Sequence, residues 1–206
     1  MAELIEDQYC QKCSTASDIN EHLPILRKYA MECETVAECG IRSIVSTWAL
    51  LSGLIASPQS NCRLLCIDIE PVPKIAEVAE IALAAGVQLE FQQIDSVHAD
   101  LKDGVDMLFI DTWHVYGHLR RELAAHHTKV RRYIAMHDTT VDKENGESLR
   151  MHHNIAEVSA AAGYSIEDVT NGLGRAVSEF LADHPEWVID IVYNNNNGLT
   201  ILRRVA

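Results

Sequence analysis

The sequence predicts an α/β protein with a mostly parallel sheet that ends in an antiparallel hairpin. Short apolar segments alternate with amphipathic segments over the first two thirds of the chain. The apolar segments are near-continuous runs, which is typical of parallel strands buried on both faces. Near the end of the chain, NNNNG (194–198) joins two strand-like segments. An Asn-Gly turn between two strands indicates a hairpin.

The spacing of apolar residues predicts five strands and the helices between them. Helices are expected where apolar residues recur every three or four positions, and Gly86 is a typical residue at a helix end. The alternation of strands and helices implies βαβ units with right-handed crossovers. The expected strands are residues 36–40, 63–70, 87–95, 105–111 and 131–138. The expected helices are residues 18–33, 44–57, 74–86 and 118–127.

The last third of the chain is expected to form the antiparallel end of the sheet. A helix at 173–184 precedes strands at 187–194 and 199–205, which form the hairpin. Residues 139–172 are less regular, and we expect one helix there, at 149–163. We expect one domain over residues 1–206, with residues 1–30 as an N-terminal helical cap. The length is also compatible with one domain of a longer polypeptide.

Composition excludes several classes of function. The chain has 206 residues, of which 48% are hydrophobic, so it can bury a substantial core. Its net charge of -13 disfavours nucleic acid and anionic membrane surfaces as partners. We find neither an apolar run of about 20 residues nor a signal-like N-terminus, so we expect a cytoplasmic protein. The sequence leaves open whether the chain forms a homo-oligomer.

The six cysteines are expected to be reduced thiols. Cys10-x-x-Cys13 lacks the second such pair that a structural zinc site usually needs. The pairs His126-His127 and His152-His153 also resemble metal ligands. Adjacent residues of a helix point to different sides, however, so both pairs are expected at the surface.

Polar residues stand at the carboxyl end of each of the five strands. In an open α/β sheet, ligands bind in the crevice beyond these ends. A single aspartate after a strand is more often a turn former than a ligand. Polar residues at the ends of five successive strands would lie together along one rim of the sheet. Unpaired carboxylates there are costly unless they bind a cation or hydroxyl groups. The residues are Glu38, Gly40, Asp68, Asp95, Asp111, His137 and Asp138.

This ordered set resembles the class I S-adenosylmethionine-dependent methyltransferases. That Rossmann-like fold has seven strands, of which the last is antiparallel, and the resemblance covers residues 30–206. FIDTWHVYGHLRREL followed by YIAMHDTT resembles a metal-dependent group within it, and so does GLGRAVSEFLADHPEW with NNNNGLTILRR. This group includes macrocin-type sugar O-methyltransferases and the cephalosporin-hydroxylase-like group that contains rhamnosyl O-methyltransferases. Its shared pattern is Asp-x-x-His after the fourth strand and an acidic doublet after the fifth.

The resemblance implies transfer of a methyl group from S-adenosylmethionine to a hydroxyl of a sugar, a glycan or a similar small polyhydroxyl acceptor. It does not identify the acceptor. The implied cofactor residues are Glu38 and Gly40 at the methionine end, Asp68 at the ribose, and Asp95 and Ser96 at the adenine. Arg42 and Ser43 follow Gly40 where the family has further glycines, and we expect them to contact the cofactor in a different way.

The resemblance also implies a divalent metal, magnesium or manganese. A hard cation bound by carboxylates can orient a hydroxyl and lower its pKa, and an imidazole can take the proton. The implied metal residues are Asp111, His137 and Asp138, with His114 as the general base beside Asp111. Trp113 or Tyr116 would face the acceptor; the alternative is that both belong to the core or a wall.

Two departures from the family pattern keep other functions open. The loop after Gly40 has no further glycine, and the doublet after the fifth strand is His137-Asp138. A histidine there favours manganese or another transition metal, or it does not bind metal at all. A non-catalytic nucleotide-binding or scaffold module of the same fold stays open. A nucleotide-dependent oxidoreductase would need a GxGxxG turn, which ECGIRSI does not supply.

Overall fold

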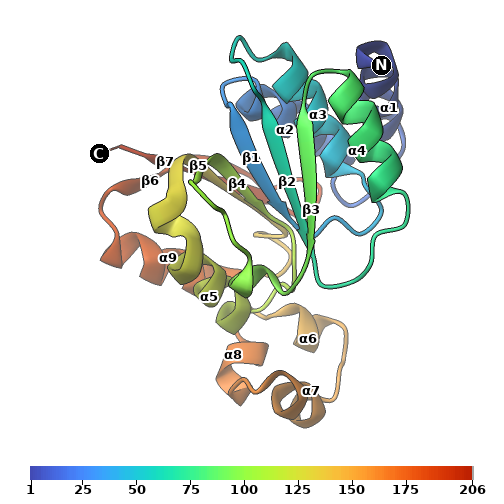
Figure 1. Cartoon of the computed structure of the whole chain (residues 1–206). Coiled ribbons are helices and arrows are strands. Elements are labelled where there is room, and N and C mark those ends of the chain that lie inside the picture. The colour runs from blue at the N-terminus through green and yellow to red at the C-terminus, as the bar shows by residue number, and fades with distance from the viewer. Residues whose placement is uncertain (206) are drawn as a thin grey trace.

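The computed structural model describes residues 1–205 and contains a seven-stranded sheet with the strand order β3-β2-β1-β4-β5-β7-β6 (Figure 1). The first five strands pair in parallel, and β7 runs antiparallel to both β5 and β6. The predicted fold class and the C-terminal hairpin are confirmed. The strands are β1 (Thr35–Cys39), β2 (Arg63–Asp68), β3 (Gln88–Gln93), β4 (Val105–Ile110), β5 (Val130–His137), β6 (Trp187–Tyr193) and β7 (Leu199–Arg204).

Helices cover both faces of the sheet. The cores on the two faces include α1 to α4 on one side and α5 and α9 on the other. The helices are α1 (Ala2–Ser14), α2 (Leu23–Ala30), α3 (Ser46–Ala56), α4 (Ile75–Ala84), α5 (Tyr116–His126), α6 (Glu147–Arg150), α7 (Ile155–Ala162), α8 (Ile166–Thr170) and α9 (Leu173–Asp183). Three short 3-10 helices are η1 (Asn20–His22), η2 (Ser96–His98) and η3 (His127–Lys129). Across residues 1–205, no helix is long and apolar enough to cross a membrane.

Strand β4 shows why the central strands read as unbroken apolar runs. Met107 and Phe109 belong to the core under α1 to α4, whereas Leu108 and Ile110 belong to the core under α5 and α9. All four side chains are buried. Successive side chains of a strand point to opposite faces, so a strand covered on both sides needs an apolar residue at every position.

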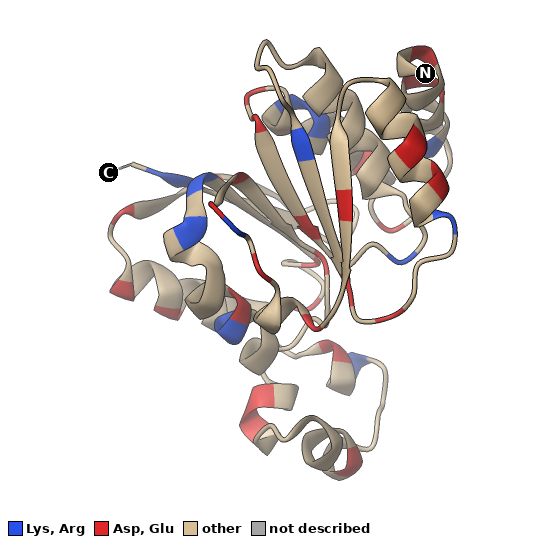
Figure 2. Cartoon of the chain, viewed as in Figure 1, with Lys and Arg blue, Asp and Glu red and all other residues tan. Residues whose placement is uncertain are grey.

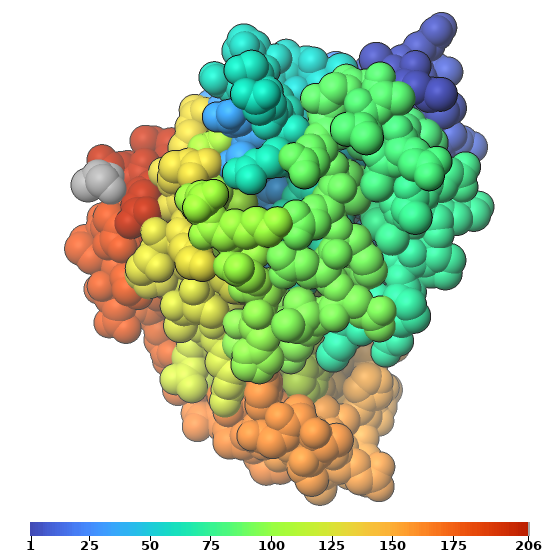
Figure 3. Space-filling model, in the orientation of Figure 1, coloured from blue at the N-terminus to red at the C-terminus, as the bar shows by residue number. Residues whose placement is uncertain are grey.

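The segment 139–172 differs from its expected single helix. It forms α6, α7 and α8, which lie beyond the carboxyl ends of the strands and protrude from the body of the molecule (Figures 1 and 3, orange). A new helix begins at Ile155 because the Asn154 side chain accepts a hydrogen bond from the Glu157 N–H. Ser165 and Asp168 form a capping box at α8. Every residue of α7 is exposed or only partly buried. The lobe formed by α6, α7 and α8 is therefore held mainly by its contacts nearest the body of the protein.

Gly40 lets β1 end tightly against β4. Its φ is +86°, and a Cβ atom there would lie 1.9 Å from the Asp111 carbonyl oxygen. The backbone is fixed on both sides, because the Gly40 N–H donates to Ile67 and the Asp111 N–H donates to Cys39. Glycine is therefore required at this position because the ends of β1 and β4 approach each other closely.

We expect Gly40→Ala to lower the free energy of unfolding by about 2–5 kcal/mol, because it adds a backbone clash to a left-handed φ. Gly86→Ala is the matched control. Its φ is +90°, but no heavy atom lies within 4 Å of the added Cβ. The control should cost about 1–2 kcal/mol. Urea unfolding of both variants measures the difference, and equal losses would contradict the clash.

Candidate functional site

Two adjoining cavities open at the carboxyl ends of the parallel strands. The first has a volume of about 460 Å³ and the second of about 270 Å³. They share Gly40, Asp68 and Thr112 as walls. Acidic positions gather where the strands run into their loops (Figure 2). The predicted convergence of polar strand ends on one rim is therefore what the structure shows.

An aromatic pair forms one wall of the first cavity. Trp113 and Tyr164 are stacked, with ring centroids 5.7 Å apart and an interplanar angle of 25°. The Tyr164 hydroxyl lies 3.1 Å from Nδ1 of His118. Tyr164 follows α7, so the protruding lobe supplies half of this wall. The pair suits a flat heteroaromatic ligand, which stacks on such faces.

Polar side chains line the first cavity beside this aromatic pair. The Ser96 hydroxyl donates to Glu122 at 2.6 Å and lies 3.2 Å from Nε2 of His118. The Asp95 carboxylate caps η2 by accepting the Val97 N–H at 2.9 Å. Asp95 and Ser96 both line this cavity, as the resemblance implies for residues beside an adenine.

Asp68 holds the loop after β1 in place. One of its carboxylate oxygens accepts the N–H groups of Ile41 and Arg42, and the other accepts the Glu70 N–H. Each carboxylate oxygen can accept two hydrogen bonds, so one acceptor position stays free toward the cavity. Asp68 can therefore position the loop and still accept a ligand hydroxyl.

The remaining residues predicted for the cofactor lie in different places. Glu38 is fully buried behind the loop, where it accepts the Ser46 hydroxyl at 2.5 Å, and burial raises its pKa to about 7. It does not line either of the two cavities among the described residues. The Arg42 side chain is 82% exposed and pairs with Asp18 at 3.0 Å. Ser43 lines the second cavity.

Two aspartates and two histidines meet at the second cavity. The His114 ring lies between two carboxylates, with Nε2 at 3.1 Å from Asp111 and Nδ1 at 3.1 Å from Asp138. His137 Nδ1 is 3.4 Å from the same Asp111 oxygen and 3.3 Å from the same Asp138 oxygen. Asp138 reaches this position with a left-handed φ of +57°. The ends of β4 and β5 thus bring together all four residues predicted for metal and base.

Contacts between the carboxylates and the imidazoles control the charge of this cluster. Burial by itself would raise the pKa of Asp111, but the contacts with His114 and His137 hold that pKa well below its usual range. Burial by itself would lower the pKa of His137, but Asp111 and Asp138 raise it to about 10. The pKa of His114 is also raised, because its contacts with these carboxylates outweigh burial. Two carboxylates thus face two imidazoles that favour the protonated form.

The cluster has the donors that a divalent metal needs. Asp111, His114 and Asp138 each offer a ligand atom, and these atoms lie within 4.8 Å of one another. Nδ1 of His114, Nδ1 of His137 and one Asp138 oxygen are buried without a hydrogen-bond partner. A bound cation would take the place of the imidazole protons as the counter-charge. The structure brings His114 closer to the two aspartates than His137, which the resemblance assigned to the metal.

A second layer of charge surrounds the cluster. Asp142 and Glu147 each place an oxygen 3.6 Å from Nδ1 of His114. Asp142 is fully buried and binds Arg150 through both of its oxygens, at 2.6 and 2.8 Å. The edge of the His22 ring faces His137, with centroids 5.5 Å apart. None of these residues follows a predicted strand, so the strand-end pattern could not identify them.

The two aromatic residues proposed for the acceptor separate in the structure. Trp113 lines the first cavity rather than the second. The Tyr116 side chain is 6% exposed and its hydroxyl donates to Glu179 of α9 at 2.7 Å. Tyr116 is the first residue of α5, and its side chain packs between α5 and α9. Its position thus matches the core alternative, away from both cavity walls.

Solved structures that resemble this chain include several methyltransferases. An O-methyltransferase from Bacillus cereus in complex with S-adenosylhomocysteine is 14% identical with a TM-score of 0.55, over 99% of this chain and 90% of that one. A methyltransferase of Podospora anserina bound to S-adenosylhomocysteine is 13% identical with a TM-score of 0.56, over 98% and 88%. The 1,6-didemethyltoxoflavin N1-methyltransferase of Burkholderia thailandensis is 12% identical with a TM-score of 0.60, over 92% and 79%.

These likenesses confirm the class I methyltransferase fold, with its antiparallel C-terminal hairpin. No protein-family model matches the sequence, and no curated protein sequence matches it. The neighbours include O-methyltransferases and N-methyltransferases, so the fold by itself does not fix the acceptor atom.

We expect Arg150→Met to destabilise the fold by about 2–3 kcal/mol, because it leaves the buried Asp142 carboxylate without its cation. The expected loss of stability is smaller than for a fully buried ion pair, since the Arg150 side chain is 37% exposed. Arg203→Met is the control, because its pair with Asp190 is more exposed. It should cost less than about 1 kcal/mol. Thermal unfolding of both variants tests the ranking, and an equal or reversed order would contradict it.

Proposed function

We propose that the protein is an S-adenosylmethionine-dependent O-methyltransferase that acts on a hydroxyl of a sugar or similar polyhydroxyl acceptor. The observation that carries this proposal is the shared wall of Gly40, Asp68 and Thr112 between the two cavities. A molecule whose ring lies against Trp113 and Tyr164 can extend past Gly40 toward His114. The donor of the methyl group and its acceptor then meet beside the acidic cluster.

The first cavity fits the adenosyl part of the cofactor. The stacked pair of Trp113 and Tyr164 offers an aromatic face, Ser96 and Asp95 offer polar groups beside it, and Asp68 has a free acceptor position for a ribose hydroxyl. When bound, S-adenosylmethionine supplies a methyl group on a positively charged sulfur. The acidic second cavity favours that positive charge before transfer.

The second cavity supports a polyhydroxyl acceptor. Its walls include Ser17, Asp18, Ser43 and Glu147, all of which can exchange hydrogen bonds with hydroxyl groups. Several such groups around one small space suit a ligand with several hydroxyls. An apolar acceptor would leave these walls without partners, which is costly.

His114 is the candidate general base. In the transfer, the acceptor oxygen forms a bond to the methyl carbon, the sulfur–carbon bond breaks, and the hydroxyl proton passes to the imidazole. The imidazole has to be neutral beforehand, and a bound cation that replaces the imidazole protons as counter-charge would leave it so. Asp111 and Asp138 hold the ring on both sides, which fixes its orientation. A divalent metal held by Asp111 and Asp138, with His137 beside them, would lower the pKa of the hydroxyl. His114 stands equally close to both carboxylates, so its alternative role is that of a third metal ligand.

We expect Trp113→Ala to weaken the binding of S-adenosylhomocysteine about tenfold or more, because aromatic stacking of a base contributes about 1–3 kcal/mol. Calorimetric titration with and without excess chelator measures this binding, and it also shows whether cofactor binding needs a metal. Tyr9→Ala is the control, since Tyr9 lies on α1 against Arg27. No binding of S-adenosylhomocysteine to the wild-type protein in either condition would refute the proposed function.

We expect His114→Gln to reduce methyl transfer by about 100-fold or more while S-adenosylhomocysteine still binds, because the proton acceptor is lost and the first cavity is intact. The assay is release of S-adenosylhomocysteine with deoxyhexose glycans as the first acceptors. His153→Gln, at an exposed histidine, is the control. Metal titration of His114→Gln separates the two roles, since a base leaves metal binding unchanged and a ligand does not. Unchanged turnover would remove His114 from the mechanism.

A further inference from the structure

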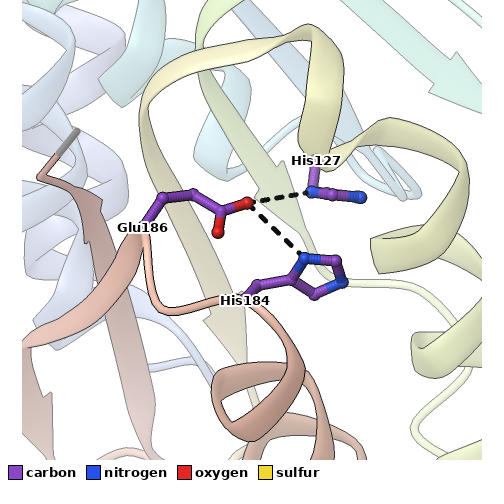
Figure 4. Close-up of side chains that lie close together, drawn as sticks. All are labelled: His127, His184 and Glu186. Carbon is purple, nitrogen blue, oxygen red and sulfur yellow. Dashed lines mark ion pairs between the residues drawn. The ribbon is translucent and has the colours of Figure 1, made fainter.

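A second group of metal-ligand side chains lies outside the proposed active site. His127 belongs to η3, and His184 and Glu186 belong to the turn between α9 and β6 (Figure 4). A carboxylate oxygen of Glu186 faces Nδ1 of both histidines. The sequence pattern paired His127 with His126, but His126 is buried and its Nε2 lies 2.7 Å from the Ser96 carbonyl oxygen. The expected surface position is thus wrong for His126, and the partner of His127 comes from the far end of α9.

The distances within this cluster suit a shared ion better than hydrogen bonds. Glu186 Oε1 is 3.5 Å from His184 Nδ1 and 3.8 Å from His127 Nδ1. Side-chain hydrogen bonds are shorter than this, and His127 Nδ1 is buried without a partner. Ligand atoms held about 2.0–2.2 Å from one tetrahedral zinc lie roughly 3.3–3.5 Å from each other. All three ligand atoms lie within 4.8 Å of one another, so small side-chain rotations bring them to one ion.

Packing holds the two imidazoles in place. Their centroids are 4.1 Å apart, and the Phe180 ring contacts both, at 5.5 Å from His127 and 4.6 Å from His184. An apolar shell of this kind limits water at a metal site and fixes the ligand rings. The side chains are 12% exposed for His127, 30% for His184 and 26% for Glu186. An ion can therefore enter from solvent and still lie among oriented ligands.

We propose that His127, His184 and Glu186 form a second metal site that takes a borderline transition metal such as Zn²⁺. Two imidazole nitrogens and one carboxylate oxygen favour zinc over magnesium or calcium, which prefer all-oxygen sites. A neutral imidazole donates a ring lone pair to such an ion. The fourth position stays open to water.

The site is separate from the acidic cluster and would act on stability. Helix α5 has 11 residues and thus spans about 16 Å, with Tyr116 at its start and His127 directly after its end. The ion would tie the end of α5 to the α9–β6 turn, which are distant in sequence. A ligand that binds only the folded chain shifts the folding equilibrium toward that state.

The test is titration of Zn²⁺ alone into the full chain by calorimetry, together with thermal unfolding in Zn²⁺ and in chelator. We expect His184→Gln and Glu186→Gln to lose about one bound Zn²⁺ per chain and most of the rise in Tm that Zn²⁺ gives the wild type. Glu186→Gln changes only one atom of a partly exposed side chain, so it should fold even if a histidine variant does not.

Two further variants make the result specific. His153→Gln removes an exposed histidine and should keep the same Zn²⁺ binding as the wild type. Asp138→Asn alters the acidic cluster and should keep the ion that His184→Gln loses. Equal Zn²⁺ stoichiometry and affinity in the wild type, His184→Gln and Glu186→Gln would overturn the proposal. None of these measurements needs methyl transfer, so the second site can fail or succeed independently of the proposed activity.

Discussion

The pairing of buried carboxylates with imidazoles at the ends of β4 and β5 is the interaction on which the site depends. Asp111 and Asp138 would repel each other in a poorly solvated crevice, and His114 and His137 lie against both of them. The strand ends that carry these side chains are closely packed, since a Cβ atom on Gly40 would lie 1.9 Å from the Asp111 carbonyl oxygen. Close packing of the backbones also limits the positions of the side chains that they carry.

Under the proposed function, the two cavities divide recognition of the cofactor from the chemistry of transfer. The first combines an aromatic wall with polar groups, and the second is surrounded by charge. Tyr164 belongs to the lobe of α6, α7 and α8, while Trp113 follows the rigid strand β4. One half of the aromatic wall is thus fixed to the sheet, and the other is carried by a segment with little buried surface. Binding of a flat ligand against both rings would join the lobe to the body of the protein.

The cluster of His127, His184 and Glu186 differs from the acidic cluster in its chemistry. One offers two nitrogens and one oxygen at a joint between helices, and the other offers mainly carboxylates at the rim of the sheet. Imidazole nitrogens favour zinc and other transition metals, whereas carboxylate oxygens suit magnesium and manganese. Under our proposals, a single chain holds one ion for stability and another beside the transferred group, each recognised by its own ligand set.

The sequence by itself determined the layered α/β fold, the order of strands and helices along the chain from α2 through β5, and the C-terminal hairpin. These follow from local rules: apolar runs for strands buried on both faces, helical spacing between them, and an Asn-Gly turn. It also determined that Asp68, Asp95, Asp111 and Asp138 would share one rim, because parallel strands present their carboxyl ends together.

Only the tertiary structure decided which other side chains join that rim. Tyr164 meets Trp113, Arg150 pairs with Asp142, and His184 approaches His127 across long stretches of chain. It also placed Glu38 behind the loop and Tyr116 in the core. Local periodicity shows which face of an element is apolar, but contacts between distant segments depend on how whole elements pack. Those contacts decide which polar residues meet in space.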